Sequence, residues 1–257
     1  MKKKARDSNL QDSMEKEKNK MRLQQFMAHC GVASRRACEQ YILDGRVAVN
    51  GSVVQELGVK VSLNDEVLVD GKKIFLEEHK RYVLLNKPEG YVCSLSDEKE
   101  RQVAVDLIKN KYSERLYNVG RLDMYSQGAI IFTNDGNFAQ KLSHPSAELE
   151  KEYIVETTRP LPAALAQDFM KGIRLDNVFY RCKKAVELNS HKMCIILIEG
   201  KNREIRKVFE SRDVGIKSLT RVRIGCVGLG NLKPGESRDL SGAEVNALLK
   251  LCHNKEY

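Results

Sequence analysis

The residue of the sequence with the clearest chemical potential is Asp123, which ends the segment GRLD at 120–123. Apolar and β-branched runs at 116–119 and 128–133 flank it, and turn-forming residues fill the space between them. This pattern predicts two strands joined by a loop, and loops held by strands commonly carry functional groups. We therefore interpret Asp123 as a candidate reaction centre. The alternative is a structural aspartate that pairs with Arg121 or accepts backbone hydrogen bonds.

Basic and aromatic side chains farther along the chain have a spacing that suits an anionic partner. Alternation along a predicted strand places Lys151 and Tyr153 on one face. In the predicted helix at 199–209, apolar residues form one stripe and three basic residues form a second: Arg203, Arg206 and Lys207. The plain alternatives are a half-buried strand tyrosine and solvated helix cations.

The chain is long enough to build a frame for these side chains. It has 257 residues, of which 42% are hydrophobic, which allows a large core in one or two domains. Strand and helix patterns alternate irregularly, with helices predicted at 162–171 and 243–251. Together with hairpin signals, this favours an α+β fold with a mixed, mainly antiparallel sheet.

The formal charge of +9 is unevenly distributed along the chain. It divides into +3 for residues 1–20, −1 for residues 21–78 and +7 for residues 79–257. A basic surface suits a polyanion, because neutralising its phosphates releases counterions. Charge alone does not distinguish RNA, DNA and an acidic protein surface.

Several classes of protein are excluded by composition. The seven cysteines are scattered and never form C-x-x-C, which predicts reduced thiols and no metal site. Neither G-x-G-x-x-G nor G-x-x-x-x-G-K occurs, so we expect no nucleotide and no other cofactor. No apolar run approaches the ~18 residues of a membrane span, and no secretory signal is present. We therefore expect a cytoplasmic monomer without a membrane partner.

The block at 21–76 has the pattern of two short helices followed by two hairpins with Asn-Gly and Asp-Gly turns. On the residues Ser34-Arg35-Arg36 and GRVAVNG (45–51), it resembles the alpha-L RNA-binding domain of ribosomal protein S-four and tyrosyl-tRNA synthetases. The resemblance implies that RNA is contacted by Arg35, Arg36 and Arg46. A helix start also favours phosphate binding. Without that resemblance, two helix arginines would be read as merely solvated.

Five segments after this block resemble, in order, the signatures of the ribosomal RNA pseudouridine synthases that carry such a domain in front. They are NKPEG (86–90), GRLDMYSQGAIIFTNDG (120–136), HPSAELEKEY (144–153), EGKNREIRKVF (199–209) and LTRVRIG (219–225). The resemblance covers about residues 21–240. Composition predicts a disordered basic tail at 1–20 and a linker at 77–81. The resemblance implies an RNA-binding domain at 21–76 and a pseudouridine synthase domain at 82–257.

The resemblance also implies a reaction and its residues. A uridine in ribosomal RNA is isomerised to pseudouridine, with Asp123 near the anomeric carbon as nucleophile or base. Tyr153 stacks on the base or moves a proton, Arg206 pairs with Asp123, and Leu229 packs against the base. Further RNA contacts are expected from Arg121, Lys151, Asn202, Arg203 and Lys207.

The resemblance points to large-subunit 23S ribosomal RNA as the substrate, and three other readings stay open. The first is a synthase for small-subunit 16S ribosomal RNA. The second is a ribosome-assembly factor that binds RNA without chemistry. The third is a glycosylase that releases the free base, since it too needs a carboxylate at the sugar.

Overall fold

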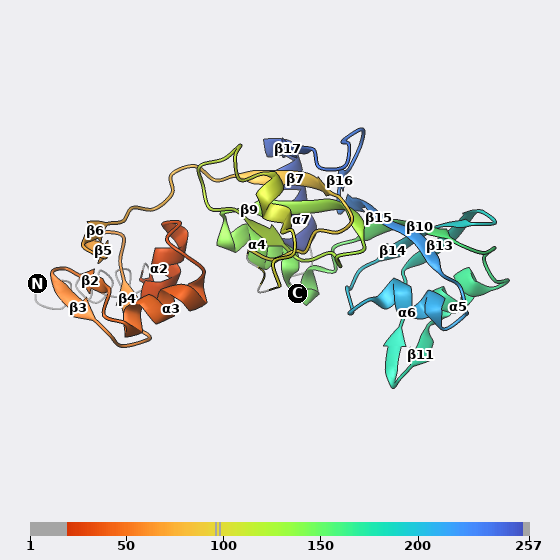
Figure 1. The fold of residues 1–257 in the computed structure, drawn as a ribbon, viewed down its shortest axis with the longest axis horizontal. Helices are drawn as coiled ribbons and strands as arrows, with labels where there is room; N and C mark the ends of the chain where they lie inside the picture. The colour runs from red at the N-terminus through yellow and green to blue at the C-terminus, as the bar shows by residue number, and fades with distance from the viewer. Residues whose placement is uncertain (1–19, 96, 98, 254–257) are drawn as a thin grey trace, which may run out of the picture. The chain divides into compact units, whose positions relative to one another are not determined.

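The computed structural model describes residues 20–95, 97 and 99–253, so the predicted tail lies outside the described residues except for Lys20. The chain divides into two compact units, Met1–His79 and Lys80–Tyr257. Each unit has a core of its own, and each is described separately below. Figure 1 shows the helices and strands of both.

The first unit packs two helices against short strands. Helix α2 covers Leu23–His29 and helix α3 covers Arg35–Leu43, where the Ser34 side chain accepts a hydrogen bond from the Ala37 amide as an N-cap. The strands are β1 (Met21–Arg22), β2 (Val47–Val49), β3 (Ser52–Val54), β4 (Lys60–Val61), β5 (Val67–Val69) and β6 (Lys72–Lys73). They form a β1-β4 pair and a sheet of order β3-β2-β5-β6. The predicted Asn-Gly and Asp-Gly turns both have positive φ, as tight hairpins require.

Nine of the described strands of the second unit form one sheet, whose main order is β13-β14-β10-β15-β9-β7-β17. The bounds are β7 (Tyr82–Lys87), β8 (Tyr117–Val119), β9 (Gln127–Thr133), β10 (Lys151–Thr157), β13 (Lys184–Asn189), β14 (Lys192–Leu197), β15 (Ile216–Ile224), β16 (Val227–Gly228) and β17 (Ser237–Asp239). Strand β8 pairs with β9, and β16 pairs with β15. The pairs are antiparallel except for β9 and β15, which are parallel. The sheet is therefore mixed and mainly antiparallel, as predicted.

Helices cover both faces of this sheet. They are η1 (Ala104–Leu107), α4 (Gly136–Ser143), η2 (Pro145–Ala147), α5 (Leu165–Lys171), α6 (Glu204–Glu210) and α7 (Gly242–His253). Side chains of α5, α6 and η1 pack with one face of the strands in a large core cluster, and those of α4 and α7 pack with the opposite face of β7 and β9 in a second. A two-stranded hairpin, β11 (Ile173–Leu175) and β12 (Val178–Tyr180), extends beyond α5 and α6 (Figure 1).

The contact between β9 and β15, which we call the seam, is short. It consists of the residue pairs Thr220–Gln127 and Arg221–Gly128. Gly128 has a φ of 108°, and a Cβ atom there would lie 2.2 Å from the backbone oxygen of Arg221. Only glycine allows the two backbones to approach this closely. The seam thus joins a half-sheet β13-β14-β10-β15 to a half-sheet β9-β7-β17.

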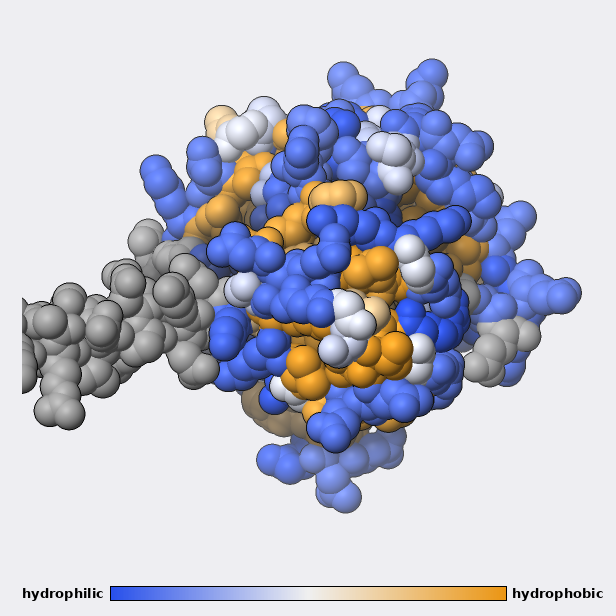
Figure 2. Space-filling model, turned by 90° about the vertical axis from the view of Figure 1, so that its left-hand side faces the viewer, coloured by the Kyte–Doolittle hydropathy of each residue, from blue (hydrophilic) through white to orange (hydrophobic). Residues whose placement is uncertain are grey.

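Two features of the surface bear on the expected partners. Among the residues that the structure describes, no helix combines the length and apolar character needed to cross a bilayer. The face drawn in Figure 2 is mainly hydrophilic and is interrupted by apolar patches. Such a surface is ordinary for a folded protein.

Candidate active site

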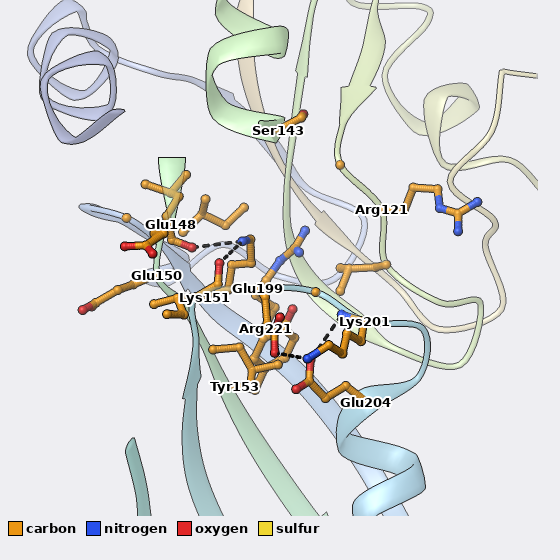
Figure 3. A pocket seen from close by; sticks show the side chains of 18 of the residues that line it. Arg121, Ser143, Glu148, Glu150, Lys151, Tyr153, Glu199, Lys201, Glu204 and Arg221 are labelled. Atoms are coloured by element: carbon orange, nitrogen blue, oxygen red, sulfur yellow. Dashed lines mark hydrogen bonds and ion pairs between the residues drawn. The ribbon is translucent and has the colours of Figure 1, made fainter. Parts of the chain in front are cut away.

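A cavity of about 1510 Å³ opens on the second unit, and it gathers residues from all of the motif segments after NKPEG. Its lining includes Asp123, Tyr153, Arg206 and Arg221. Ligand sites of proteins are commonly a few hundred to a thousand cubic ångströms, so this cavity has room for more than one nucleotide. Figure 3 shows several of its charged residues gathered around Tyr153, while Arg121 projects away from that group.

Asp123 lies on the loop between β8 and β9, and its side chain is exposed to the cavity. The loop is held by a fully buried amine. Lys87, at the end of β7, donates hydrogen bonds from Nζ to the carbonyl oxygens of Pro88 (2.9 Å), Tyr91 (2.9 Å) and Met124 (3.4 Å). Burial is the main reason that the pKa of Lys87 falls to about 8, and the charge of Asp123 opposes that fall. The loop that carries the Asp123 carboxylate is therefore anchored by the buried amine of Lys87.

A thiol supports the same loop. The amide of Leu122, one residue before the carboxylate, donates to Sγ of Cys93 at 3.3 Å. The pKa of the Cys93 thiol is raised, chiefly by burial. The protonated, uncharged form is thereby favoured under the loop.

Tyr153 lies on β10, where it pairs with Arg221 of β15 and is 8% exposed. The pairing of β10 with β15 has a register shift between Glu152 and Tyr153, so the ladder of the two strands is irregular at this point. Four apolar residues line the cavity near the tyrosine: Leu122, Leu197, Ile205 and Leu219. A ring in an apolar wall, open on one side, is suited to stacking against a planar base.

Arg206 lies on α6 and reaches the loop of Asp123, but not through the expected ion pair. Its Nη2 donates to the carbonyl of Tyr125 at 2.5 Å, and among the described residues Asp123 and Arg206 form no ion pair. The pKa of Arg206 is lowered, mainly by burial and then by Arg203, while the charge of Asp123 raises it. The guanidinium therefore holds the loop through its backbone, and the charge of Asp123 acts on it without a direct contact.

Glu204, the first residue of α6, is a buried carboxyl group in the same cavity at 3% exposure. Its Oε2 accepts from the amide of Lys201 at 3.2 Å, while Oε1 is buried without a hydrogen-bond partner. Burial is the main cause that raises its pKa to about 7. Three other buried atoms in the cavity lining also lack a partner among the described residues: Ser126 Oγ, Arg206 Nε and Arg221 Nη2. Unsatisfied polar atoms are rare in folded proteins, so their concentration here marks a functional site.

Backbone strain points to the same place. Glu148 and Arg203 both line the cavity and have φ values of 42° and 51°. Non-glycine residues in this region of φ are uncommon and cluster at functional sites.

The residues predicted to contact RNA in the second unit are distributed as follows. Arg121, Asn202 and Arg203 are exposed and line the cavity, and Arg203 forms an ion pair with Glu210 at 2.9 Å. Lys151 also lines it, but its Nζ donates to the carbonyls of Leu149 (3.0 Å) and Ile198 (3.2 Å). These bonds tie the start of β10 to the end of β14.

Two predicted contact residues lie outside the lining. Lys207 faces β12, where Nζ donates to the hydroxyl of Tyr180 at 3.3 Å. Leu229 packs against the second core cluster. Contact with the base by Leu229 stays a prediction.

In the first unit, Arg35 and Arg36 are exposed in the first turn of α3. Arg46 is engaged within the unit: Nε and Nη2 donate to the carboxylate of Asp70 at 2.8 and 2.5 Å, and its guanidinium carbon lies 3.9 Å from the ring centroid of Tyr41. A cation in this arrangement can still contact a phosphate on its open side.

Sequence reasoning assigned no role to Lys87, Glu204 or Arg221, although all three lie within the motif segments. Their types suggested surface charge, because lysine, glutamate and arginine are seldom fully buried. The signal that was present is position. Lys87 precedes Pro88 at a strand end, and Arg221 stands among β-branched and apolar residues of a predicted strand. Among the described residues, no group of three or more His, Cys, Asp or Glu side chains could hold a metal ion.

Comparison with known proteins gives this arrangement a family. The model of the family described as RNA pseudouridylate synthase matches residues 81–211, and that of the S4 domain matches residues 21–67. The chain is 39% identical over 241 residues to ribosomal large subunit pseudouridine synthase B of Bacillus subtilis (strain 168), covering 91% of this chain and 98% of the relative. It is 36% identical over 237 residues to the protein of the same name from Pseudomonas aeruginosa, covering 88% of this chain and 61% of the relative.

A solved structure agrees with the sequence relatives. A crystal structure of a pseudouridylate synthase superposes with a TM-score of 0.65 at 26% identity, covering 89% of this chain and 99% of the other. The matched family model spans the loop of Asp123, Tyr153 and Arg206. The chain therefore belongs to the RNA pseudouridylate synthase family, and it is a pseudouridine synthase that carries an RNA-binding S4 domain in front of its catalytic domain.

Proposed function

We propose that the enzyme converts a specific uridine of large-subunit 23S ribosomal RNA to pseudouridine, with Asp123 as the reacting carboxylate. The observation that carries this proposal is that Asp123, Tyr153 and Arg206, taken from three separate segments, line one cavity. The choice of the large subunit rests on the relatives from B. subtilis and P. aeruginosa, whose names specify it. Because one chain supplies all three residues, we expect the enzyme to act as a monomer. From the sequence we also expect it to act in the cytoplasm and without a cofactor.

The chemistry follows from the geometry. Breaking the N1–C1′ bond of uridine develops positive charge on the sugar, which a carboxylate stabilises or captures, or relieves by removing a sugar proton. Asp123 is the exposed carboxylate that the loop presents to the cavity. The freed uracil turns, C5 bonds to C1′, the proton of C5 leaves and N1 gains a proton. Tyr153 stacks on the base, and Arg206 fixes the loop and the field at Asp123.

Reaching the target requires the uridine to leave its stack. Extrusion of a base costs a few kcal/mol, which contacts to the RNA backbone must offset. Arg121, Asn202 and Arg203 at the cavity and Lys151 in its wall are the residues we expect to contribute there. Lys207, outside the cavity lining, is expected to contact a more distant part of the bound RNA, and Leu229 is expected to pack against the base.

The test is release of tritium from ribosomal RNA labelled at uracil C5. We expect release from 23S RNA by the wild type, and a fall of about 100-fold or more with Asp123→Asn, because a single catalytic carboxyl commonly contributes that much. Asp213→Asn is the matched control, since it changes an exposed aspartate at a φ of 56° that asparagine also tolerates.

The same assay separates the alternatives. Release of tritium from 16S but not from 23S RNA would identify small-subunit RNA as the substrate. Binding of ribosomal RNA without release of tritium would indicate a ribosome-assembly factor. Release of free uracil from the RNA into solution, without formation of pseudouridine, would indicate a glycosylase.

A further inference from the structure

Arg221 is a buried cation to which the proposed reaction assigns no task. It lies on β15 at the seam, is 4% exposed and lines the cavity of Asp123. Its Nε donates to the carbonyl of Ala129 at 2.7 Å, while Nη2 is buried without a partner among the described residues. A guanidinium keeps its charge at any ordinary pH, so burying it without a counter-ion is costly. A ligand that pairs with the buried guanidinium would offset this free-energy cost.

The charges around Arg221 make an anion the suitable ligand. From β7, Lys87 has its pKa lowered to about 8 by burial first, with Arg221 among the further causes. From β10, Lys151 has its pKa lowered by burial and then by Arg221. The cavity also holds the carboxyl groups of Asp123 and Glu204, but neither forms an ion pair or hydrogen bond with Arg221 in the described part of the chain. The charge of the guanidinium therefore acts against those of Lys87 and Lys151, and among the described residues no carboxylate forms an ion pair with it.

The guanidinium is also held in place. Its backbone lies between Tyr153 of β10 and Gly128 of β9, and the bond to Ala129 fixes Nε. Nη2 is buried and unpartnered among the described residues, so a ligand that enters the cavity and shifts its lining can supply the missing acceptor. Figure 3 shows Arg221 close to Tyr153, the residue assigned to the base. A group bound by Arg221 therefore lies beside the extruded nucleotide.

We propose that Arg221 binds a phosphodiester group adjacent to the uridine that enters the cavity. This inference rests on the proposed function, because RNA is the anion that it places there. Phosphate oxygens accept the paired N–H donors of a guanidinium, and they carry one negative charge at every nucleotide. The contact makes Arg221 a substrate-positioning residue, separate from Arg206, whose guanidinium is bonded to the loop of Asp123.

The experiment removes the charge of the RNA and the charge of the protein independently. The probe is the shortest stem-loop of ribosomal RNA that the enzyme modifies, with the modified uridine located by carbodiimide mapping. A neutral methylphosphonate replaces one linkage at a time on both sides of that uridine. Pseudouridine formation is measured with wild type, Arg221→Gln, Arg221→Lys and Arg159→Gln, the last being an exposed arginine outside the cavity lining.

We expect one linkage at which the methylphosphonate lowers kcat/KM of the wild type by roughly 10- to 100-fold, the effect of losing a hydrogen bond between charged groups. Arg221→Gln should lose a similar factor on natural RNA and should then be indifferent to that linkage. Arg221→Lys should keep part of the discrimination, and Arg159→Gln should behave as the wild type does. Non-additivity of the two changes is the sign of a direct contact.

Three results would overturn the inference. A wild type that tolerates every neutral linkage has no such phosphate contact, and this arm needs no variant to fold. Undiminished discrimination in Arg221→Gln or Arg221→Lys assigns the phosphate to another residue. A lower kcat in either variant with unchanged discrimination makes Arg221 a support for Asp123. Failure to modify any ribosomal RNA instead refutes the proposed function, so the two failures are distinguishable.

Discussion

At the scale of single residues, the site is a small group of charges in which burial sets the properties. Lys87 is an ammonium with no exposure, and its hydrogen bonds to three carbonyls hold the loop that carries Asp123. A neutral amine donates fewer bonds than an ammonium. The pKa of about 8 therefore means that the loop loses part of its anchor in alkaline solution.

Glu204 predicts a pH dependence of stability. Its pKa is raised from 4.5 to about 7, so its protonated form stabilises the fold fully below about pH 4.5 and this contribution is lost as the pH rises through 7. The loss amounts to about 3 kcal/mol at most. Glu204→Gln keeps the shape of the side chain and removes the titration. We expect urea unfolding of the second unit to give this variant a stability advantage that grows between pH 5 and pH 8.

The control for this prediction is Glu187→Gln, a change of an exposed glutamate on β13. It should follow the wild type at both pH values. An advantage of Glu204→Gln that is equal at pH 5 and pH 8 would show that Glu204 does not titrate in this range.

The sequence supplied the candidate site residues but not their surroundings. Residue type and motif order identified Asp123, Tyr153 and Arg206, because loops and strand starts are local features. The bond of Arg206 to Tyr125, in place of the expected ion pair with Asp123, depends on how α6 docks on a loop 81 residues away. No pattern of spacing carries that information.

At the scale of elements, the seam between β9 and β15 decides where the cavity forms. The two strands pair at only two positions, so the sheet opens beyond them. Tyr153 stands on one half-sheet, whereas the loop of Asp123 belongs to the other. Parallel neighbours cannot be joined by a short turn, which is why these segments lie far apart in the sequence.

Gly128→Ala tests the seam. The added Cβ would lie within 3 Å of three backbone atoms of Arg221, and the φ of 108° disfavours any side chain. Backbone strain and overpacking together should lower the free energy of unfolding by about 2–4 kcal/mol. We expect chemical denaturation to show this loss and activity to fall with it.

Gly228→Ala is the matched control, because nothing lies within 4 Å of a Cβ atom at Gly228 and its φ is ordinary. It should change stability by only a fraction of the effect at Gly128. Equal effects of the two substitutions would argue against a special constraint at the seam.

Helix and hairpin signals were sufficient for much of the fold. The Asn-Gly and Asp-Gly turns are local chemistry, and the structure has them where they were predicted. The hairpin β11–β12 and strand β13 were not predicted, because their residues are largely exposed and lack a clear alternation. Which strands become neighbours, the seam above all, is settled by packing across the whole unit.

At the scale of the molecule, the two units differ in net charge, and this bears on how each of them binds RNA. Residues 21–78, which make up most of the first unit, have a net charge of −1, so the RNA affinity of this segment must come from a local basic face. We expect Arg35→Glu combined with Arg36→Glu to weaken RNA binding and to reduce the slope of log affinity against log salt by about two. Filter binding at several salt concentrations measures both, and kcat on saturating RNA should stay unchanged.

A charge-matched control is Lys60→Glu combined with Lys72→Glu, which reverses two exposed lysines on strands of the same unit. Its effect on affinity should be clearly smaller. If both double variants weaken binding equally, the first unit contributes only a general attraction and the start of α3 has no special part.

The narrow seam has a consequence for fidelity. Since the carboxylate belongs to one half-sheet and the tyrosine to the other, a change of register at Gly128 would misalign the two side chains. An RNA that grips both halves would hold them in register, whereas a poorly matched RNA would be held and then released unaltered.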